Sequence, residues 1–470
     1  MQEHTSAGAV ITPARPSIWR TEVADTVKLS WPMALTQLGQ IAMMTSDLAL
    51  LGRLGEPVVA AVALAHTMLF AAFVIGMGVV SAVAPLAAQA FGAREPRMVR
   101  RALRVGFWAA TLLGVPLSFA QIYGEDMLVS LGQSPEAAHL ASDYLYGLAW
   151  CLVPAWWFIA IRGFMGAVNR PEPALWITVA AIPANLLLAY ALIYGAFGLP
   201  RLELFGAGLA TTFVNIGMCT AAIWIAYASR PFKKYQILGR CWRCDWTLLG
   251  RLFWVGMPIS GSFLLEYGLF AAAALLMGWL GTVELAAHQI ALQIASILFM
   301  VPFGISMAAT VRVGHAAGRI DSAGTRRAGL AALALAAAFM AAMTVLVGVG
   351  REQVPALFLG DAASDAGATA ALAATLLLVG ATFFIADGVQ AVAAGALRGL
   401  NDTRVPLLFA AICFWAIGFA ACYILGFTLG FGAIGIWIGL SLAVMLYAAL
   451  LVWRFHLLTK RGYLPVLSTA

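Results

Sequence analysis

Three acidic residues lie inside long apolar stretches of this sequence, and they are the first candidates for a chemical role. Asp47, Glu266 and Asp387 each have mostly apolar neighbours on both sides. An ionised side chain at the centre of a bilayer costs at least about 2.5–3.5 kcal/mol, so such residues usually face a cavity and bind or relay a charged partner. No Lys or Arg is expected inside these stretches to neutralise them. We therefore expect them to bind a cation; neutral acids hydrogen-bonded to a neighbouring helix are the structural alternative.

The residues before Asp47 add further polar groups to the same helix. Gln40, Met43 and Asp47 share one broad face through their three- and four-residue spacing, and Gln37 precedes them. Pro32, fifteen residues before Asp47, removes a backbone hydrogen bond and permits a bend. We expect Gln37 and Gln40 to line a cavity, with a plain helix contact as the alternative.

The stretch around Glu266 repeats this arrangement with different side chains. Ser262, Glu266 and Phe270 recur every four residues, which places a hydroxyl, a carboxylate and an aromatic ring on one stripe. Pro258 precedes them as a second candidate for a helix bend. This combination suits a hydrophobic organic cation, and a core stripe with a neutral Glu266 is the alternative.

Polar residues also accompany Asp387. Gln390 follows it by three residues, and small residues after Gln390 allow a close approach of helices. In another apolar stretch, Gln289 and Gln293 are one turn apart. We expect these glutamines to line a substrate cavity in which a proton, a metal ion and a cationic ligand compete for Asp387.

The elements that hold these residues are predicted to be membrane spans. Apolar residues make up 62% of the 470 residues and charged residues only 10%, against about 25% charged residues in an ordinary soluble domain. Stretches that can hold spans of about 20 residues indicate an all-α polytopic membrane protein with twelve transmembrane helices. Their expected limits are 29–51, 58–88, 105–123, 144–161, 174–195, 207–228, 252–278, 286–311, 328–349, 370–396, 406–426 and 433–453.

The net charge of +7 follows the pattern of a membrane topology. All of the 28 Lys and Arg residues fall on one side of the predicted spans except Arg53, Arg201 and Arg351. The positive-inside rule then places that side, with both termini, in the cytoplasm. This pattern accounts for the basic balance without nucleic acid, which is not expected as a partner. No secretory signal is expected before the first span.

The six cysteines do not indicate a set of extracellular disulfides. Four lie in predicted spans, and Cys241 and Cys244 lie in a predicted inner loop. The spacing of this pair suits half of a zinc or redox site, but no second pair completes it. The sequence leaves the role of Cys241 and Cys244 open.

The sequence contains an internal repeat that relates its two halves. Pro32 corresponds to Pro258 at an offset of 226 residues, and Gly78 corresponds to Gly304 at the same offset. Each half holds six spans, so both halves enter the membrane in the same direction, and substrate sites in such proteins lie between the repeats. We expect an N-terminal six-helix bundle over 1–228, a cytoplasmic linker over 229–251 and a C-terminal six-helix bundle over 252–470. A duplicated channel scaffold is the alternative.

Motifs for nucleotide hydrolysis and for common catalytic chemistry are missing from the sequence. There is no Gly-Lys-Ser/Thr phosphate loop, no His-Glu-x-x-His pattern and no Gly-x-Ser-x-Gly turn. We therefore expect neither an enzyme nor a bound cofactor. Energy for transport would come from an ion gradient or a partner.

Several of these motifs together resemble the multidrug and toxic compound extrusion (MATE) family, in particular its NorM-like bacterial branch. The resemblance rests on the stretch from Ala286 to Gly314, on the Glu266 span and on Ala386–Gly395 with Arg398–Gly399. It implies two parallel-repeat six-helix bundles around a central cavity that opens alternately to either side of the bacterial inner membrane. It also implies export of amphipathic organic cations in exchange for Na⁺ or H⁺.

The resemblance also assigns expected roles to single residues. The family's acidic positions match Asp47, Glu266 and Asp387, and Asn185 matches a polar position of the fifth span. Two departures affect the cation shell: Ala181 stands where Asn is often found, and Phe383 stands where Tyr is frequent. Coupling to Na⁺ and coupling to H⁺ therefore both stay open.

We predict a secondary active antiporter that exports amphipathic, mostly cationic drugs or toxic compounds. Glu266 and Asp387 would bind the coupling ion, including Na⁺ if coupling uses sodium, and Asp47 would be a second acidic site linked to substrate release. One alternative is a flippase or exporter of a single endogenous lipid-linked or natural product, which would favour Arg or Lys in the cavity. Another is a non-transporting membrane scaffold. The expected partners are organic cations, the coupling ion and the lipid bilayer, and nothing in the sequence requires more than a monomer.

Overall fold

The computed structural model describes residues 18–130, 132–239, 241–353 and 366–462, and its described elements are all helical. The first half of the chain supplies α1 (Ile18–Leu51), α2 (Glu56–Ser81), α3 (Val83–Gly92), α4 (Pro96–Ile122), α5 (Gly124–Ser130), α6 (Pro135–Leu148), α7 (Leu152–Ala167), α8 (Glu172–Tyr194) and α9 (Glu203–Ala228). The second half supplies α10 (Trp246–Leu280), α11 (Thr282–Gly318), α12 (Ser322–Val349), α14 (Ala366–Gly399), α15 (Arg404–Ala410), α16 (Ala420–Tyr423) and α17 (Gly432–Lys460). The ends of the two predicted bundles, 1–17 and 463–470, lie outside the described residues.

The described helices correspond to the predicted spans, with local differences at the first and the fourth span. Ten described helices are long and apolar enough to cross a membrane, and a bent pair, α6 with α7, adds an eleventh. The remaining predicted span, the first one at 29–51, lies in α1, whose apolar sequence is interrupted by Gln37, Gln40 and Asp47. The all-α polytopic fold is therefore confirmed.

The fourth predicted span, 144–161, differs most from the structure. It is split between α6 and α7, which meet at an angle of 48°. Pro154, in the first turn of α7, has no N–H to continue the hydrogen-bond ladder of α6, so the helix ends and begins again. At its other end, α7 continues to Ala167, six residues beyond the predicted limit.

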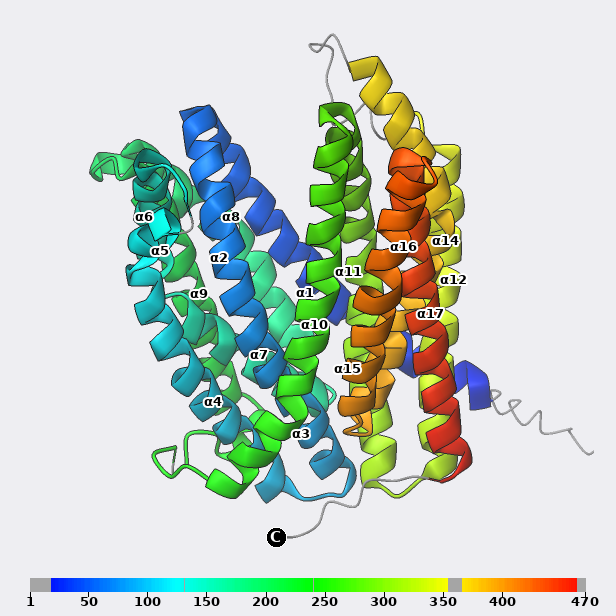
Figure 1. Ribbon diagram of the computed structural model, residues 1–470. Coiled ribbons are helices and arrows are strands. Elements are labelled where there is room, and N and C mark those ends of the chain that lie inside the picture. The colour runs from blue at the N-terminus through cyan, green and yellow to red at the C-terminus, as the bar shows by residue number, and fades with distance from the viewer. Residues whose placement is uncertain (1–17, 131, 240, 354–365, 463–470) are drawn as a thin grey trace, which may run out of the picture.

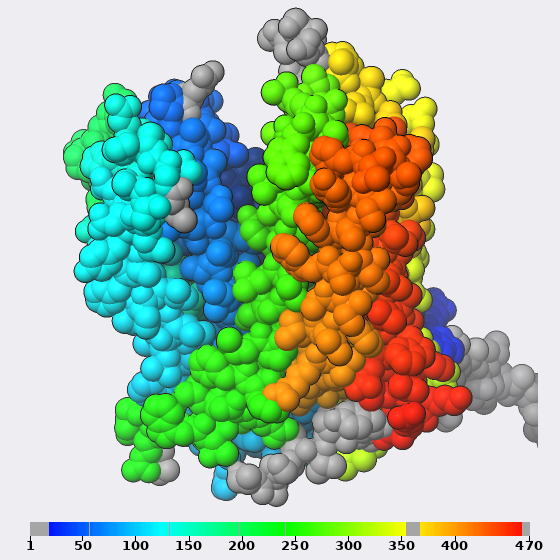
Figure 2. All heavy atoms as spheres, viewed as in Figure 1, coloured from blue at the N-terminus to red at the C-terminus, as the bar shows by residue number. Residues whose placement is uncertain are grey.

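The two halves of the chain form lobes that pack together at one end and separate at the other (Figure 1). The packed end holds α3 and the loop after α9, and the surface is hollowed between the lobes at the opposite end (Figure 2). Within the packed region α1 lies along α11, and α10 lies along α2. These two pairs are equivalent in the internal repeat.

Glycines allow the backbones of the two lobes to touch. A Cβ added at Gly78 would lie 2.5 Å from the Cα of Ser260, and one added at Gly304 would lie 2.5 Å from the Cα of Ala34. At the 226-residue offset, Gly78 corresponds to Gly304 and Ala34 corresponds to Ser260, so the two contacts are equivalent. The repeat therefore builds the same close approach twice, once at each helix pair.

Side-chain hydrogen bonds close the packed end in a similarly repeated way. Gln89 donates to the carbonyl of Gly399 at 2.8 Å, and Asn401 donates to the side-chain oxygen of Gln89 at 2.7 Å. His315, which corresponds to Gln89 at the 226-residue offset, bonds the carbonyl of Ala167 at 2.7 Å. Ion pairs also join the halves here: Arg101 with Asp245, Arg312 with Glu22 and Asp25, and Arg327 with Glu22.

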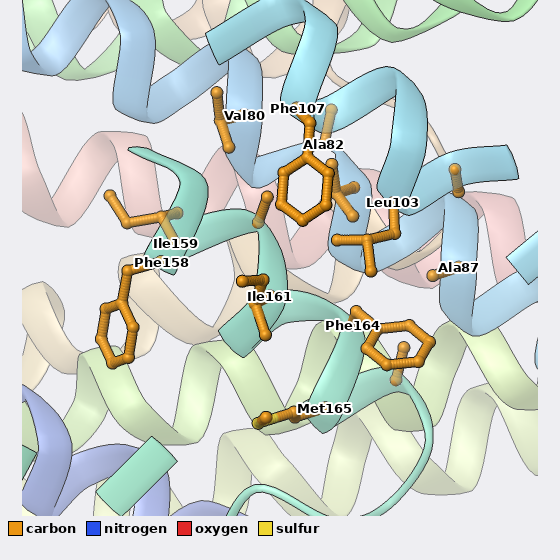
Figure 3. Close-up of a cluster of buried hydrophobic side chains, with 14 of the residues drawn as sticks. Val80, Ala82, Ala87, Leu103, Phe107, Phe158, Ile159, Ile161, Phe164 and Met165 are labelled. Atoms are coloured by element: carbon orange, nitrogen blue, oxygen red, sulfur yellow. The ribbon is translucent and has the colours of Figure 1, made fainter. Parts of the chain in front are cut away.

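One apolar core fills much of the first lobe and extends into α10 and α11, and another core lies within the second lobe. In the first lobe the core contains fully buried aromatic and aliphatic side chains from α2, α3, α4 and α7, among them Leu103, Ile161 and Phe164 (Figure 3). Large apolar residues are also exposed on the outer faces, for example Trp224 on α9 and Trp279 on α10. Such exposure fits a lipid-facing surface, since the bilayer rather than water is the solvent there.

Candidate functional site

One glutamine brings together the two acidic residues of the second lobe. The side-chain amide of Gln390 donates to Glu266 at 2.6 Å and to Asp387 at 3.0 Å. Glu266 lies on α10, whereas Asp387 and Gln390 lie on α14, where both are buried. Two carboxylates held by one amide in a desolvated position need a compensating cation when both are ionised. The pair can therefore hold a proton or a small cation.

The other members of the Glu266 stripe serve mainly the helix and the core. Ser262 donates its hydroxyl to the carbonyl of Pro258 at 2.9 Å, and Thr36 does the same to Pro32 at 2.7 Å. Helices α10 and α1 run continuously through these two prolines. Phe270 lies edge-on to Phe383, with ring centroids 6.0 Å apart. Its ring joins the apolar core of the second lobe, so a role in substrate contact stays a prediction.

Asp47 forms a separate acidic site in the first lobe. Its carboxylate accepts a hydrogen bond from Asn185 at 2.6 Å and another from Thr211 at 3.2 Å, and only 9% of the residue is exposed. The three residues come from α1, α8 and α9. The structure thus joins Asn185 to Asp47, and it adds Thr211, which sequence reasoning missed. A threonine in an apolar span carries little signal until the helix facing it is known.

Two arginines that follow directly after predicted span limits, at 161 and 396, lie inside helices in the structure. Arg162 is buried on α7 and donates to the side-chain oxygens of Gln37 and Gln40, the latter at 3.5 Å. Arg398 lies on α14 with its guanidinium over the ring of Phe263. Both helices continue past their predicted limits, which carries the two arginines into the packed interior.

The remaining predicted polar residues lie apart from the acids. Gln289 and Gln293 are exposed on α11, and neither shares a described hydrogen bond with Glu266 or Asp387. Over the described residues there is no group of three or more His, Cys, Asp or Glu side chains suited to a metal ion. Cys241 bonds the carbonyl of Leu238 at 2.8 Å.

The Asp47 site gives a first test of how its donors matter. Replacing Asn185 with Leu removes the shorter hydrogen bond to a buried carboxylate, which is worth about 1.5–3 kcal/mol for a charged acceptor. We expect transport by Asn185→Leu to fall about tenfold or more, and by Thr211→Val to fall less, because the threonine bond is longer. Thr220→Val, at an exposed residue on the same α9, is the matched control. Equal rates for Asn185→Leu and the control would show that this bond has no part in function.

Two six-helix lobes with buried acidic residues define a polytopic membrane protein of the twelve-span, repeated type. The chain belongs to the MatE family, whose model matches residues 32–191 and 258–424. The two matched segments lie one in each lobe. The resemblance stated from the sequence is therefore confirmed.

Known relatives match nearly the whole chain. It is 63% identical to a "Probable multidrug resistance protein NorM" of Rhodopseudomonas palustris, with 97% of this chain and 96% of the relative covered. It is 58% identical to a protein of the same name from Bradyrhizobium diazoefficiens, with 94% of each covered. Among solved structures, it is similar to the outward-facing conformation of a multidrug resistance MATE family transporter, with a TM-score of 0.85, 20% identity and coverage of 94% of this chain and 97% of that one.

Proposed function

We propose that this protein is a secondary active antiporter that exports amphipathic, mostly cationic drugs or toxic compounds in exchange for Na⁺ or H⁺. Membership of the MatE family makes it a multidrug efflux transporter rather than an enzyme. The observation that carries the proposal is the bridge from Gln390 to Glu266 and Asp387, because it creates a buried anionic site that one cation can neutralise.

The geometry supports an exchange mechanism. The coupling cation and the cationic substrate would compete for the carboxylates of Glu266 and Asp387, so binding of one favours release of the other. Asp47, in the other lobe, would be the second acidic site and would aid substrate release. A membrane potential supplies about 2.3 kcal/mol per elementary charge per 100 mV to an exchanger that moves net charge. The hollow between the lobes would be the substrate route, with Gln37, Gln40, Gln289 and Gln293 along it.

The two alternative functions are a non-transporting scaffold and a flippase, and different observations bear on each. A non-transporting scaffold is not supported, since the chain belongs to a family of transporters. A flippase for a single lipid-linked product was disfavoured because no Lys or Arg was expected in the spans, and Arg162 and Arg398 remove that objection. Two arginines are nevertheless few for a phosphate-rich ligand, so we retain drug efflux as the main proposal.

The direct experiment is dye transport by purified protein in liposomes. A fluorescent organic cation is followed while a Na⁺ gradient and an H⁺ gradient are imposed separately. We expect one of the two ion gradients to drive the dye into the liposomes against the concentration gradient of the dye. A protein that inserts correctly and moves the dye under neither gradient would contradict antiport.

The proposed topology places both termini and the linker 229–251 in the cytoplasm of a bacterium, with the packed end of the lobes on the same side. We also propose an N-terminal bundle over 1–228, a linker over 229–251 and a C-terminal bundle over 252–470. We propose that the protein is a monomer. In this arrangement the hollow shown in Figure 2 faces outward.

Cysteine labelling tests this topology. Cys241 and Cys244 are partly exposed in the linker, whereas Cys151, Cys219, Cys413 and Cys422 are buried. A membrane-impermeant maleimide is therefore expected to label inside-out vesicles and not intact cells. Burial raises the pKa of both linker thiols, so their reactive thiolate fraction, and with it the labelling rate, should increase as the pH is raised above neutrality. If intact cells are labelled and the double variant Cys241→Ser/Cys244→Ser removes this labelling, the linker lies outside the cell and the proposed topology is wrong.

A further inference from the structure

A groove in the second lobe is formed by side chains of α12, α14 and α17. Helix α14 packs against both α12 and α17, and the three helices lie together in that lobe (Figure 1). The volume of the groove is about 790 Å³, within the range of about 300–1,000 Å³ that is usual for ligand sites. Because one lobe alone supplies its wall, the groove is distinct from the hollow between the lobes.

Apolar side chains line most of the groove. Ile385, Ala386 and Val389 form one stripe of α14 through their three- and four-residue spacing. Met445 and Val452 line the groove from α17, and 40% of Met445 is exposed. An apolar wall on helices that cross a membrane suits a hydrocarbon chain, since the surrounding solvent is lipid.

The basic side chains of the groove lie at one end. Arg326 is in the second turn of α12, and His456 is five residues from the end of α17. Trp453 lies beside them with 55% of its surface exposed, and tryptophan is enriched where a membrane meets water. No Asp or Glu is among the described residues that line the groove. This end therefore carries a positive charge that its own lining does not neutralise.

Arg326 has no acidic partner in the part of the chain that the structure describes. Its neighbour Arg327 pairs with Glu22 at 3.6 Å, and Arg454 of α17 pairs with Asp402 at 2.8 Å. None of the described ion pairs involves Arg326, and the residue is exposed. A guanidinium binds a phosphate group with two parallel hydrogen bonds, so Arg326 suits a phosphate at the end of the groove.

The groove extends through about one leaflet of a bilayer. Met445 and His456 lie toward its opposite ends and are eleven residues apart on α17, which is about 16 Å at about 1.5 Å per residue. One leaflet takes half of a hydrocarbon core of about 30 Å. The basic end lies where α12 begins and α17 ends, at the packed end of the lobes (Figure 1). In the proposed topology this end is cytoplasmic, so the groove is open to the inner leaflet.

We infer that this groove binds one anionic phospholipid of the inner leaflet, with its phosphate at Arg326 and an acyl chain along α14 and α17. Basic pockets between membrane helices on the cytoplasmic side are suited to anionic head groups. Ala386, which precedes Asp387, belongs to the groove. The lipid would therefore contact the helix that carries the acidic site, on a different face, and would hold that helix against α17.

Native mass spectrometry of the purified protein tests the inference. Phosphatidylglycerol and phosphatidylcholine with identical acyl chains are titrated into wild type, Arg326→Gln, Ala449→Phe and Arg170→Gln. Ala449 is an exposed groove residue of α17, so a phenylalanine there fills the groove without removing a charge. Arg170 is an exposed arginine beyond the end of α7 and serves as the matched control.

We expect wild type to bind one phosphatidylglycerol about fivefold more tightly than phosphatidylcholine, the scale of one basic residue near an anionic lipid. Arg326→Gln should weaken phosphatidylglycerol binding by a similar factor and remove the preference. Ala449→Phe should weaken binding of both lipids, and Arg170→Gln should behave as the wild type does. If Arg326→Gln cannot be purified, Ala449→Phe decides the outcome.

Three results would overturn the inference. One is equal affinity of wild type for the two lipids, and another is unchanged phosphatidylglycerol binding in either Arg326→Gln or Ala449→Phe. The third is a dimer in the same spectra that Ala449→Phe dissociates, because a second copy of the chain would then cover the groove. Lipid binding is measured without transport, so each of these results leaves the proposed efflux function untouched.

Discussion

Asp387→Asn is expected to abolish ion-driven transport while leaving the protein folded. Asn has nearly the same shape as Asp but cannot carry the charge that balances a bound cation. Loss of one member of a buried ionic site costs about 3–5 kcal/mol, so uptake driven by the coupling gradient should fall more than about a hundredfold. Glu266→Gln should have a similar effect, because Gln390 bridges the two acids. Dye uptake in liposomes under the effective gradient is the measurement.

The matched control is an acid outside the site. Asp126 is exposed on α5, and Asp126→Asn changes the same functional group without affecting Gln390. Its transport should equal that of wild type. Unchanged gradient-driven uptake in well-inserted Asp387→Asn and Glu266→Gln would mean that these acids have only a structural role, the alternative that the sequence left open.

Gly304→Val is expected to have the second largest effect, through the packing of the lobes. Its Cβ would collide with the backbone of Ala34, so α11 and α1 could not approach as they do here. Overpacking of this kind costs about 1–3 kcal/mol, which shifts the population of this conformation about fivefold or more. We expect a lower unfolding temperature for the purified protein and slower dye transport. Gly78→Val, at the equivalent contact with Ser260, should behave alike.

Another glycine in a helix provides the control. Gly217 lies in α9 with nothing within 4 Å of an added Cβ, and Ala is the better helix former. Gly217→Ala should therefore keep or slightly raise the unfolding temperature. If Gly304→Val has the unfolding temperature and the dye transport rate of the wild type, the close contact between the lobes has no importance for the transport cycle.

The sequence predicted the spans because the bilayer imposes a strong pattern on composition. Apolar stretches, basic loops and the 226-residue repeat were sufficient to place the helices that hold Asp47, Glu266 and Asp387. Helix ends were less predictable. A span limit set at a basic residue assumes that the helix ends there, and α7 and α14 instead continue through Arg162 and Arg398.

Contacts between distant helices could be predicted only in part. The spacing of Gln390 from Asp387 follows from one helix, but its bond to Glu266 depends on how α10 packs against α14. Thr211 was missed for the same reason, since its partner Asp47 lies 164 residues away. The repeat also gave no guide to these sites, because the acids of one half have no acidic counterparts in the other.

Reverse coupling tests the central claim most directly. Liposomes containing the protein are given equal concentrations of the coupling ion on both sides and an outward or inward gradient of the cationic dye, and movement of Na⁺ or H⁺ is recorded. If Glu266 and Asp387 exchange one cation for the substrate, the dye gradient should drive the ion in the opposite direction, and Asp387→Asn should remove this movement. Dye flux through wild-type protein without movement of either ion would contradict the antiport mechanism.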